Sequence, residues 1–349
     1  MRSSYTENDV ILLLKDITGL VEPQSTEERE RLIQSGRHYC EMLPIEYVPT
    51  QKYMDVYKEA LKNYSKSTAL AVGKLSDKIM EKKGKNVVLV SLARAGIPVG
   101  ILIKRYIKMK YNVDVKHYSI SIIRGRGIDD NAMKYLLDRY EPQDLLFVDG
   151  WIGKGAILNE LKKDISVYKG VSSEIAVLAD PANVTELCGT HEDILIPSSC
   201  LNCTVSGLVS RTFLRDDIIG KDDFHGAVYY GELADADLSY EFINAIQSQF
   251  EINSKITDNV IEGLGVDEVR KIADEFNIDD INFVKPGIGE ATRVLLRRVP
   301  WKVLISNSCK DDPSLAHIVR LAEEKNVPVE YYHLVHYKAC GIIKKMADV

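Results

Sequence analysis

The chain has 349 residues, of which 45% are hydrophobic and 28% are charged, and its formal net charge is −6 at pH 7. This composition is typical of a globular protein and excludes a disordered, fibrous or low-complexity chain. The length predicts about two domains, because a single hydrophobic core rarely grows beyond about 250 to 300 residues.

The charge is unevenly distributed along the chain. Residues 281–349 contain eleven Lys or Arg and seven Asp or Glu, so this segment carries +4 and residues 1–280 carry −10. A basic segment on an acidic protein indicates a polyanionic partner for that segment alone, and a solvated surface of mixed charge is the alternative.

The N-terminal sequence lacks the basic, apolar and small-residue regions of a signal peptide, and no apolar run reaches the roughly 20 residues of a membrane span. We therefore expect a cytoplasmic protein that does not bind membranes. The six cysteines are expected to be free thiols, and the single CxxC pair, Cys200 and Cys203, predicts no metal site.

Residues 1–85 are predicted to be mainly helical. Apolar side chains recur there at helical spacing and form one stripe, at Tyr53, Val56, Tyr57, Ala60, Leu61 and Tyr64. We interpret this stripe as part of the hydrophobic core.

From residue 87 onward, short apolar runs alternate with amphipathic segments. The pattern predicts strands at 87–92, 115–123, 145–149, 175–180 and 193–197, and helices from Pro98, at 129–140, from Lys154 and from about Val205. Strands of this kind, separated by helices, indicate a doubly wound parallel sheet that is covered on both faces. Ligands bind such sheets beyond the carboxyl ends of their strands.

Glycines and arginines follow several of the predicted strands, which is typical of an anion site. The segment after Asp149 contains Gly150, Gly153 and Gly155 and is predicted to turn sharply into a helix. Glycines let backbone N–H groups approach a ligand, and a helix N-terminus favours negative charge, so this turn suits a phosphate. A turn whose glycines serve packing alone is the alternative.

These loops resemble those of type I phosphoribosyltransferases, in which a strand ending in Asp leads into a glycine-rich turn. The resemblance implies that Asp149 holds the ribose of phosphoribosyl diphosphate. It places the 5′-phosphate and its surroundings at Gly150, Gly153, Lys154, Gly155 and Ala156. It places the pyrophosphate loop at Arg94, Ala95 and Gly96, and a mobile loop that closes over the reacting centre at Arg124 and Arg126. Mg²⁺ is implied as the cofactor, and the acceptor is a base, a nucleotide or an RNA-linked substrate.

The sequence departs from this family's pattern at one carboxylate. Gly150 follows Asp149 where the family usually has a second acid, and Ala156 stands where a hydroxyl-bearing residue is usual. A non-catalytic nucleotide or RNA sensor therefore stays open beside the transferase.

A cysteine hydrolase is a further alternative. Cys200 and Cys203 come just before the helix predicted from about Val205, and the dipole of a helix N-terminus favours a thiolate. Cys200 is the nucleophile of this alternative, with His225 as its base and His191 as a second candidate base. A buried or helix-capping cysteine is the structural alternative.

Residues 281–349 are predicted to form a compact α/β module. Its elements are a glycine turn, a helix, a strand at 301–306, a helix at about 313–325, a strand at 327–332 and a final helix. Arg293, Arg297 and Arg298 share part of one helix face, which suits a phosphate backbone.

This module resembles the RNA-binding domain shared by Pelota and the kink-turn-binding ribosomal proteins. The family's turn, Gly-x-Asn-Glu-x-Thr-Lys, is matched by Gly287, Glu290, Thr292 and Arg293, with Gly289 at the Asn position. The resemblance implies RNA binding by the turn and its helix, at Gly287, Glu290, Arg293, Arg297 and Arg298.

A phosphoribosyltransferase-like body with a Pelota-like tail is similar to a bacterial family associated with tellurite-resistance and stress operons, some members of which are labelled cysteine protease StiP. We therefore predict a phosphoribosyltransferase-like domain at 1–250 with a helical extension at 1–85, a helical connector at 251–280 and a Pelota-like domain at 281–349. The predicted partners are a phosphorylated small molecule and RNA, and a homodimer is left open.

Overall fold

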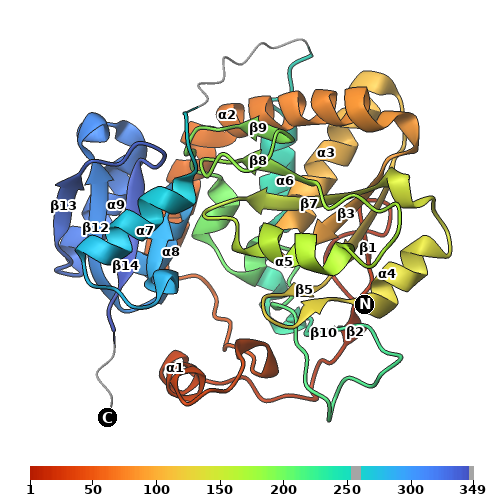
Figure 1. Ribbon diagram of the computed structural model, residues 1–349, viewed down its shortest axis with the longest axis horizontal. Coiled ribbons are helices and arrows are strands. Elements are labelled where there is room, and N and C mark those ends of the chain that lie inside the picture. The colour runs from red at the N-terminus through yellow and green to blue at the C-terminus, as the bar shows by residue number, and fades with distance from the viewer. Residues whose placement is uncertain (253–260, 346–349) are drawn as a thin grey trace.

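The computed structural model describes residues 1–252 and 261–345, which form a large α/β body and a smaller α/β unit beside it (Figure 1). The body is built on a six-stranded sheet in the order β1-β4-β3-β7-β8-β9, in which neighbouring strands are parallel. Its strands are β1 (Ile11–Leu12), β3 (Val88–Leu92), β4 (Lys116–Ile120), β7 (Leu145–Trp151), β8 (Ile175–Ala179) and β9 (Cys188–Thr190).

Helices cover both faces of this sheet. The core on one face includes α2 (Gln51–Lys83), α3 (Gly96–Tyr111) and α6 (Ser239–Gln247), and the core on the other includes α4 (Asp130–Leu137) and α5 (Ala156–Ile165). Side chains alternate between the two cores along β3, because Leu89 belongs to the first core and Val88 and Val90 to the second. The predicted fold class, a doubly wound parallel α/β sheet, is confirmed.

One strand and one helix predicted for the body are wrong. Residues 193–197 form no strand, since β9 ends at Thr190 and Pro197–Cys200 is a 3₁₀ turn. The helix predicted from about Val205 is replaced by a short 3₁₀ turn, Cys203–Val205, followed by turns and loops up to Gly226. Ile196 is buried in the core beside the helices, which explains why this segment has the apolar pattern of a strand.

The first 85 residues combine the predicted helix with strands that the sequence analysis did not predict. They contain α1 (Thr26–Gln34) and α2, and the apolar stripe lies on α2, where Val56 and Tyr57 are buried. β1 forms the edge of the large sheet, and β2 (Lys15–Asp16) pairs with β10 (Gly226–Ala227). A small hairpin of β5 (Ile122–Ile123) and β6 (Gly127–Ile128) carries the turn at residues 124–126.

The C-terminal unit is a four-stranded sheet in the order β11-β14-β12-β13. Its elements are α7 (Gly265–Glu275), β11 (Val284–Pro286), α8 (Ile288–Arg297), β12 (Pro300–Ser306), α9 (Ala316–Glu324), β13 (Val329–Tyr332) and β14 (Ala339–Ile343). The predicted final helix is wrong, because its residues form β14, which is buried between β11 and β12. α7 falls within the predicted helical connector, whose residues 253–260 lie outside the described residues. Among the described helices, none is long and apolar enough to cross a membrane.

The two units share one hydrophobic core. Ile288, Ala291 and Leu295 of α8 belong to the same apolar cluster as Val56 and Tyr57 of α2. Figure 1 shows α8 beside the end of α2, on the side of the C-terminal unit that faces the body. The position of α8 is therefore fixed by burial of apolar surface.

Asp193 of the body adds a polar contact across the same boundary. Its Oδ1 accepts a hydrogen bond from the N–H of Ile288 at 3.0 Å, and its Oδ2 accepts one from the N–H of Lys338 at 2.9 Å. The carboxylate thus caps the N-terminus of α8, where the helix dipole favours negative charge. Beside it, Gly287 has a φ of +96°, which glycine adopts without strain. The glycine turn of the C-terminal unit is thereby held against the strand ends of the body.

We predict that Asp193→Ala lowers the free energy of unfolding by about 2 kcal/mol, because it leaves the buried N–H of Ile288 and the partly buried N–H of Lys338 without an acceptor. Denaturant unfolding measures the loss, and hydrogen exchange at Ile288 and Lys338 locates it. Asp267→Ala is the control, since Asp267 is exposed and pairs with the exposed Arg270. Equal exchange rates at Ile288 and Lys338 in the Asp193→Ala and native proteins would contradict this role.

Candidate functional site

A cleft of about 280 Å³ lies where the strand ends of the body meet the C-terminal unit. The loops after β3 and β7, the turn of the β5–β6 hairpin and the start of α8 converge on it. Its polar and loop residues are Ala95, Arg124, Asp149, Trp151, Gly153, Lys154, Gly155, Ala156, Lys285, Pro286, Glu290 and Arg293. The structure therefore brings Asp149 and most of the predicted phosphate turn together with Glu290 and Arg293, which were predicted to bind RNA.

The turn at residues 150–156, which we call the ligand loop, is tighter than the sequence predicts. β7 continues through Trp151, and α5 begins at Ala156, directly after Gly155 with a φ of +83°. The hydroxyl of Tyr337 in the C-terminal unit donates to the carbonyl of Gly153 at 2.6 Å. The ligand loop is therefore shaped by both units.

Positive side chains line this cleft from several elements. Arg124 donates to Asn282 Oδ1 at 2.8 Å, and the Lys154 ammonium donates to the carbonyls of Ile281 and Val284 at 2.6 and 3.1 Å. Lys285, by contrast, makes no side-chain hydrogen bond or ion pair within residues 1–252 and 261–345, and burial lowers its pKa. Lys285 is thus the cation in the cleft that is best placed to accept an anionic ligand.

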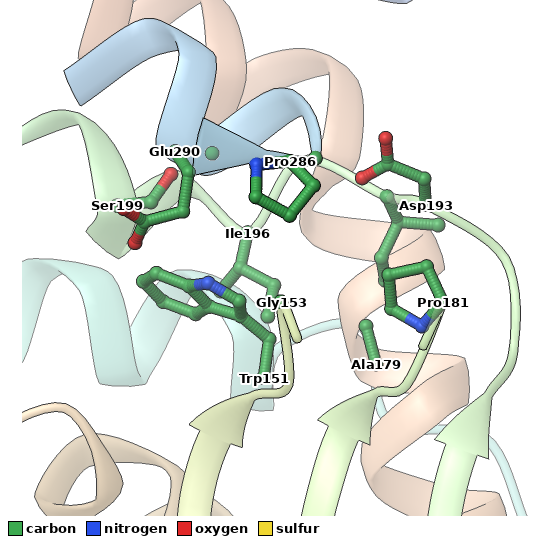
Figure 2. A pocket seen from close by; sticks show the side chains of 12 residues that line it. Trp151, Gly153, Ala179, Pro181, Asp193, Ile196, Ser199, Pro286 and Glu290 are labelled. Carbon is green, nitrogen blue, oxygen red and sulfur yellow. The ribbon is translucent and has the colours of Figure 1, made fainter. Parts of the chain in front are cut away.

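Arg293 lies over the indole of Trp151, with 4.7 Å between the guanidinium carbon and the ring centroid. Its Nη1 also pairs with Glu290 Oε1 at 3.0 Å. Figure 2 shows Trp151 at the end of β7 and Gly153 of the ligand loop below Pro286 of β11 and Glu290 of α8. Trp151, Pro286 and Glu290 line both the cleft and a small neighbouring pocket, so they form the wall between the two.

Burial shifts the pKa values of the two central ionisable groups in the cleft. It raises the pKa of Asp149 to about 6, although a hydrogen bond from the N–H of Gly150 acts in the opposite direction and lowers the pKa. It lowers the pKa of Lys154 to about 8, helped by the charges of Lys285 and Arg124. Near neutral pH the cleft therefore holds a carboxylate and an ammonium that each change charge with a small change of conditions.

Three residues predicted for the phosphoribosyl diphosphate site have other roles in the structure. Arg94 pairs with Glu46 at 2.9 Å, and Arg126 pairs with Glu41 at 2.8 Å, so neither guanidinium lines the cleft. Gly96 starts α3 and lies so close to β7 that a Cβ atom would come within 2.3 Å of the carbonyl oxygen of Val148. Of the predicted pyrophosphate loop, Ala95 alone is among the residues that line the cleft.

The arginine face predicted to bind RNA is turned toward the body. Arg293 Nε donates to the carbonyl of Ser199 at 3.4 Å, and Arg297 Nη2 is buried. Gly287 lies beside Asp193, and Glu290 lines the cleft. Arg298 is half-buried at the end of α8. The helical spacing of these arginines is therefore correct, but part of the face they share meets protein instead of solvent.

Cys200 and Cys203 do not have the environment predicted for a nucleophile. They lie in 3₁₀ turns of four and three residues, which lack the dipole of a longer helix. Both are buried, and burial raises the pKa of each thiol to about 12. His225 is engaged elsewhere, with its Nδ1 2.8 Å from Ser121 Oγ, and His191 lies beside Cys188.

A thiol–imidazole contact that the sequence analysis missed occurs at Cys40. The Sγ atom lies 2.9 Å from Nδ1 of His38, whose Nε2 is 3.1 Å from the carbonyl of Arg124. Cys40 is buried, and burial raises its pKa to about 11 although the charge of Arg126 opposes this. The His-x-Cys spacing was the available sequence signal for this contact. Trp151, which follows Gly150, and Lys285, two residues before Gly287, were also missed, because the glycines of these turns drew the interpretation to the backbone.

The chain matches two protein families. Residues 3–247 match the family described as "Tellurite-like stress resistance cysteine protease StiP", and residues 263–345 match the "PELOTA RNA binding domain". A protein from Acinetobacter baylyi named "Cysteine protease StiP" is 34% identical over 363 residues, which cover 98% of this chain and 94% of that protein.

Solved structures similar to this chain include purine phosphoribosyltransferases. A hypoxanthine-guanine phosphoribosyltransferase from Bacillus anthracis is 16% identical, covers 42% of this chain and 81% of its own, and has a TM-score of 0.25. A xanthine-guanine-hypoxanthine phosphoribosyltransferase from Helicobacter pylori is 18% identical, covers 34% of this chain and 74% of its own, and has a TM-score of 0.25. Similarity at this level says nothing about activity.

We predict that sulfate binds the cleft about tenfold more tightly at pH 5 than at pH 7.5, because protonation of Asp149 below about pH 6 removes a negative charge. Sulfate is the probe because its own charge is constant over this range, and calorimetry measures its affinity. Asp149→Asn is the control and is expected to bind sulfate equally well at both pH values. An affinity of the native protein that does not change with pH would contradict the prediction.

Proposed function

Since the chain belongs to the tellurite-like stress resistance cysteine protease StiP family and ends in a PELOTA RNA-binding domain, we propose that it is an enzyme that binds a phosphorylated substrate in the cleft between the two units. The observation that carries this proposal is the composition of the cleft. Four cations line it against two carboxylates, namely Arg124, Lys154, Lys285 and Arg293 against Asp149 and Glu290.

This excess of positive charge suits a phosphoryl group, since a phosphate monoester carries about two negative charges at neutral pH. The ligand loop supports the same ligand, because its N–H groups and the N-terminus of α5 lie at the carboxyl end of β7. Arg124 of the body and Lys285 of the C-terminal unit line the same cleft. A phosphate in this cleft would therefore be held between the body and the RNA-binding domain.

The ligand class that we propose is phosphoribosyl diphosphate or a nucleotide. The ligand loop would hold the 5′-phosphate, Asp149 would accept from the ribose hydroxyls, and Lys285 with Arg124 would bind the diphosphate. In the transfer, an acceptor atom forms a bond to C1 of the ribose while the bond from C1 to the diphosphate oxygen breaks, and pyrophosphate leaves with the electron pair.

Mg²⁺ would accompany a diphosphate and neutralise part of its charge. The described residues contain no group of three His, Cys, Asp or Glu side chains that could hold an ion alone. We therefore propose Mg²⁺ only as an ion that arrives with the ligand beside Asp149, the carboxylate nearest to the ligand loop.

The position of the RNA-binding domain supports an RNA-linked substrate. Gly287 and Glu290, which match the family's RNA-binding turn, lie next to the ligand loop. An RNA end recognised by this turn would place its terminal phosphate at the mouth of the cleft. RNA and the phosphorylated ligand would then meet at one site.

We predict that phosphoribosyl diphosphate with Mg²⁺ binds the native protein, and that Asp149→Ala and Lys285→Met each weaken the binding about tenfold or more, because each removes a charge-assisted contact. Calorimetry measures both affinities. Lys58→Met is the control, since Lys58 is exposed on α2. Binding without pyrophosphate release on adding RNA or bases would favour a sensor, and no binding to the native protein would refute the proposal.

The relative's printed name supports a second candidate, a cysteine protease. Among the cysteines, we propose Cys40 as its nucleophile, because His38 is close enough to take the thiol proton. The Sγ would attack a peptide carbonyl, and His38 would pass the proton to the leaving amine. Since Cys40 is buried beside Arg126 and Glu41, the turn at residues 124–126 must move before a substrate can reach it.

We predict that a peptide-based thiol electrophile at neutral pH modifies Cys40 in a Cys309→Ser background, which removes the one cysteine that is partly exposed among the described residues. His38→Ala is expected to slow the modification by about 100-fold, because it removes the base. Mass spectrometry identifies the modified residue. Modification of Cys200 instead would restore the nucleophile predicted from the sequence. The protease candidate would be refuted if Cys40→Ser and Cys200→Ser both reacted as fast as the background protein.

A further inference from the structure

A group of arginines outside the cleft surrounds one buried carboxylate. Glu46 lies in the segment before α2, with 7% of its side chain exposed, and its Oε1 is 2.9 Å from Arg94 Nη2. Arg94 also donates from Nη1 to the carbonyl of Val209 at 2.9 Å, so both of its Nη atoms are engaged by the body. The charges of Arg211 and Arg297 act on the same Glu46 carboxylate. We call Arg94, Arg211 and Arg297 around Glu46 the arginine cluster.

Two members of the arginine cluster have no partner of their own. Within residues 1–252 and 261–345, the side chains of Arg211 and Arg297 make neither a hydrogen bond nor an ion pair. The Nη2 atom of Arg297 is buried without any hydrogen-bond partner. Buried polar atoms in folded proteins are nearly always hydrogen-bonded, so an unpaired guanidinium nitrogen calls for a ligand.

The charge balance of the arginine cluster points to the same conclusion. Among the side chains that the structure describes, the charges of three guanidiniums act on the one carboxylate of Glu46, which leaves two positive charges uncompensated in a poorly solvated place. Burial lowers the pKa of Arg211 and of Arg297 to about 10, and neighbouring arginines lower it further, Arg29 for Arg211 and Arg293 for Arg297. A purely structural ion network would have been expected to include a second acid.

We propose that the arginine cluster is a second anion site, at which Arg297 and Arg211 bind the phosphoryl group of a ligand. A phosphate dianion matches the two uncompensated charges, and planar guanidiniums bind phosphate oxygens in pairs. The site is separate from the cleft, because none of Arg94, Arg211 and Arg297 lines it.

The arginine cluster also spans the boundary between the two units. Arg297 belongs to α8 of the RNA-binding domain, whereas Arg94 and Arg211 belong to the body. An anion bound by Arg211 and Arg297 would therefore add an electrostatic contact between the units. Occupancy of this site and docking of the RNA-binding domain must strengthen each other, because linkage between two equilibria is reciprocal.

The experiment separates this site from the cleft by working in a Lys285→Met background, which weakens phosphate binding at the cleft. Inorganic phosphate and pyrophosphate are titrated by calorimetry in phosphate-free buffer, and melting temperatures are recorded with and without each anion. Arg211→Met and Arg297→Met are compared with Arg31→Met, an exposed arginine on α1. A short RNA is tested in two forms, with a 5′-phosphate and with a 5′-hydroxyl.

The proposal expects Lys285→Met to bind phosphate and to gain thermal stability from it. Arg211→Met and Arg297→Met each weaken the binding about tenfold or more, and Arg31→Met leaves it unchanged. Without anions, Arg211→Met melts no lower than its parent, because the substitution removes a repulsive charge; this shows that the variant folds. Tighter binding of the 5′-phosphorylated RNA than of the 5′-hydroxyl form would identify an RNA end as the source of the phosphoryl group, and equal binding of the two forms would identify a free small anion.

Two results would overturn the proposal. One is that no anion binds to Lys285→Met, and the other is that Arg211→Met and Arg297→Met bind phosphate as tightly as their parent. Neither result bears on the cleft, because the proposal for the cleft is refuted only if phosphoribosyl diphosphate does not bind the native protein, so the two proposals can fail independently.

Discussion

A buried carboxylate of the body, Asp193, binds two backbone N–H groups of the C-terminal unit, and the candidate site depends on this contact. Without it, the start of α8 would lose its cap and the glycine turn would have no fixed position over the strand ends. Apolar packing of α8 against α2 supplies affinity between the units, whereas the directional hydrogen bonds of Asp193 set their register. The cleft depends on both the apolar packing of α8 and the hydrogen bonds of Asp193.

The docking of the C-terminal unit changes the role of its basic residues. A basic tail domain on an acidic body suggests a surface that collects RNA from solution, but Arg293 stacks on Trp151 and the Nη2 atom of Arg297 is buried. In the two sites that we propose, these charges stand beside groups of the body. The body contributes glycine turns and helix N-termini, and the RNA-binding domain contributes Lys285 and arginines. One protein thus concentrates positive charge where its two units meet, despite a net charge of −6.

Local patterns in the sequence predicted the fold well where each segment packs within its own unit. Alternation of strands and helices identified the parallel sheet, and the ligand loop was found from Asp149 and its glycines. The errors at residues 193–197 and 339–343 occur where contacts with distant parts of the chain, in the same unit or in the other, decide the structure. Residues 193–197 resemble a strand because they are buried, yet Asp193 is committed to α8. Residues 339–343 form a short apolar run that is flanked by lysines, and they are extended because they pair with β11 and β12.

The candidate site, too, could be predicted from the sequence only in part. Asp149 and Gly155 could be predicted because they act through local geometry, but the direction of the α8 arginines depends on how the units dock. The central claim is that the cleft between the units holds a phosphoryl group. Crystals soaked in tungstate, an oxyanion that anomalous scattering detects, test it most directly. The account predicts an anomalous peak between Lys285, Arg124 and the ligand loop; crystals that diffract with the cleft empty at saturating tungstate would contradict it.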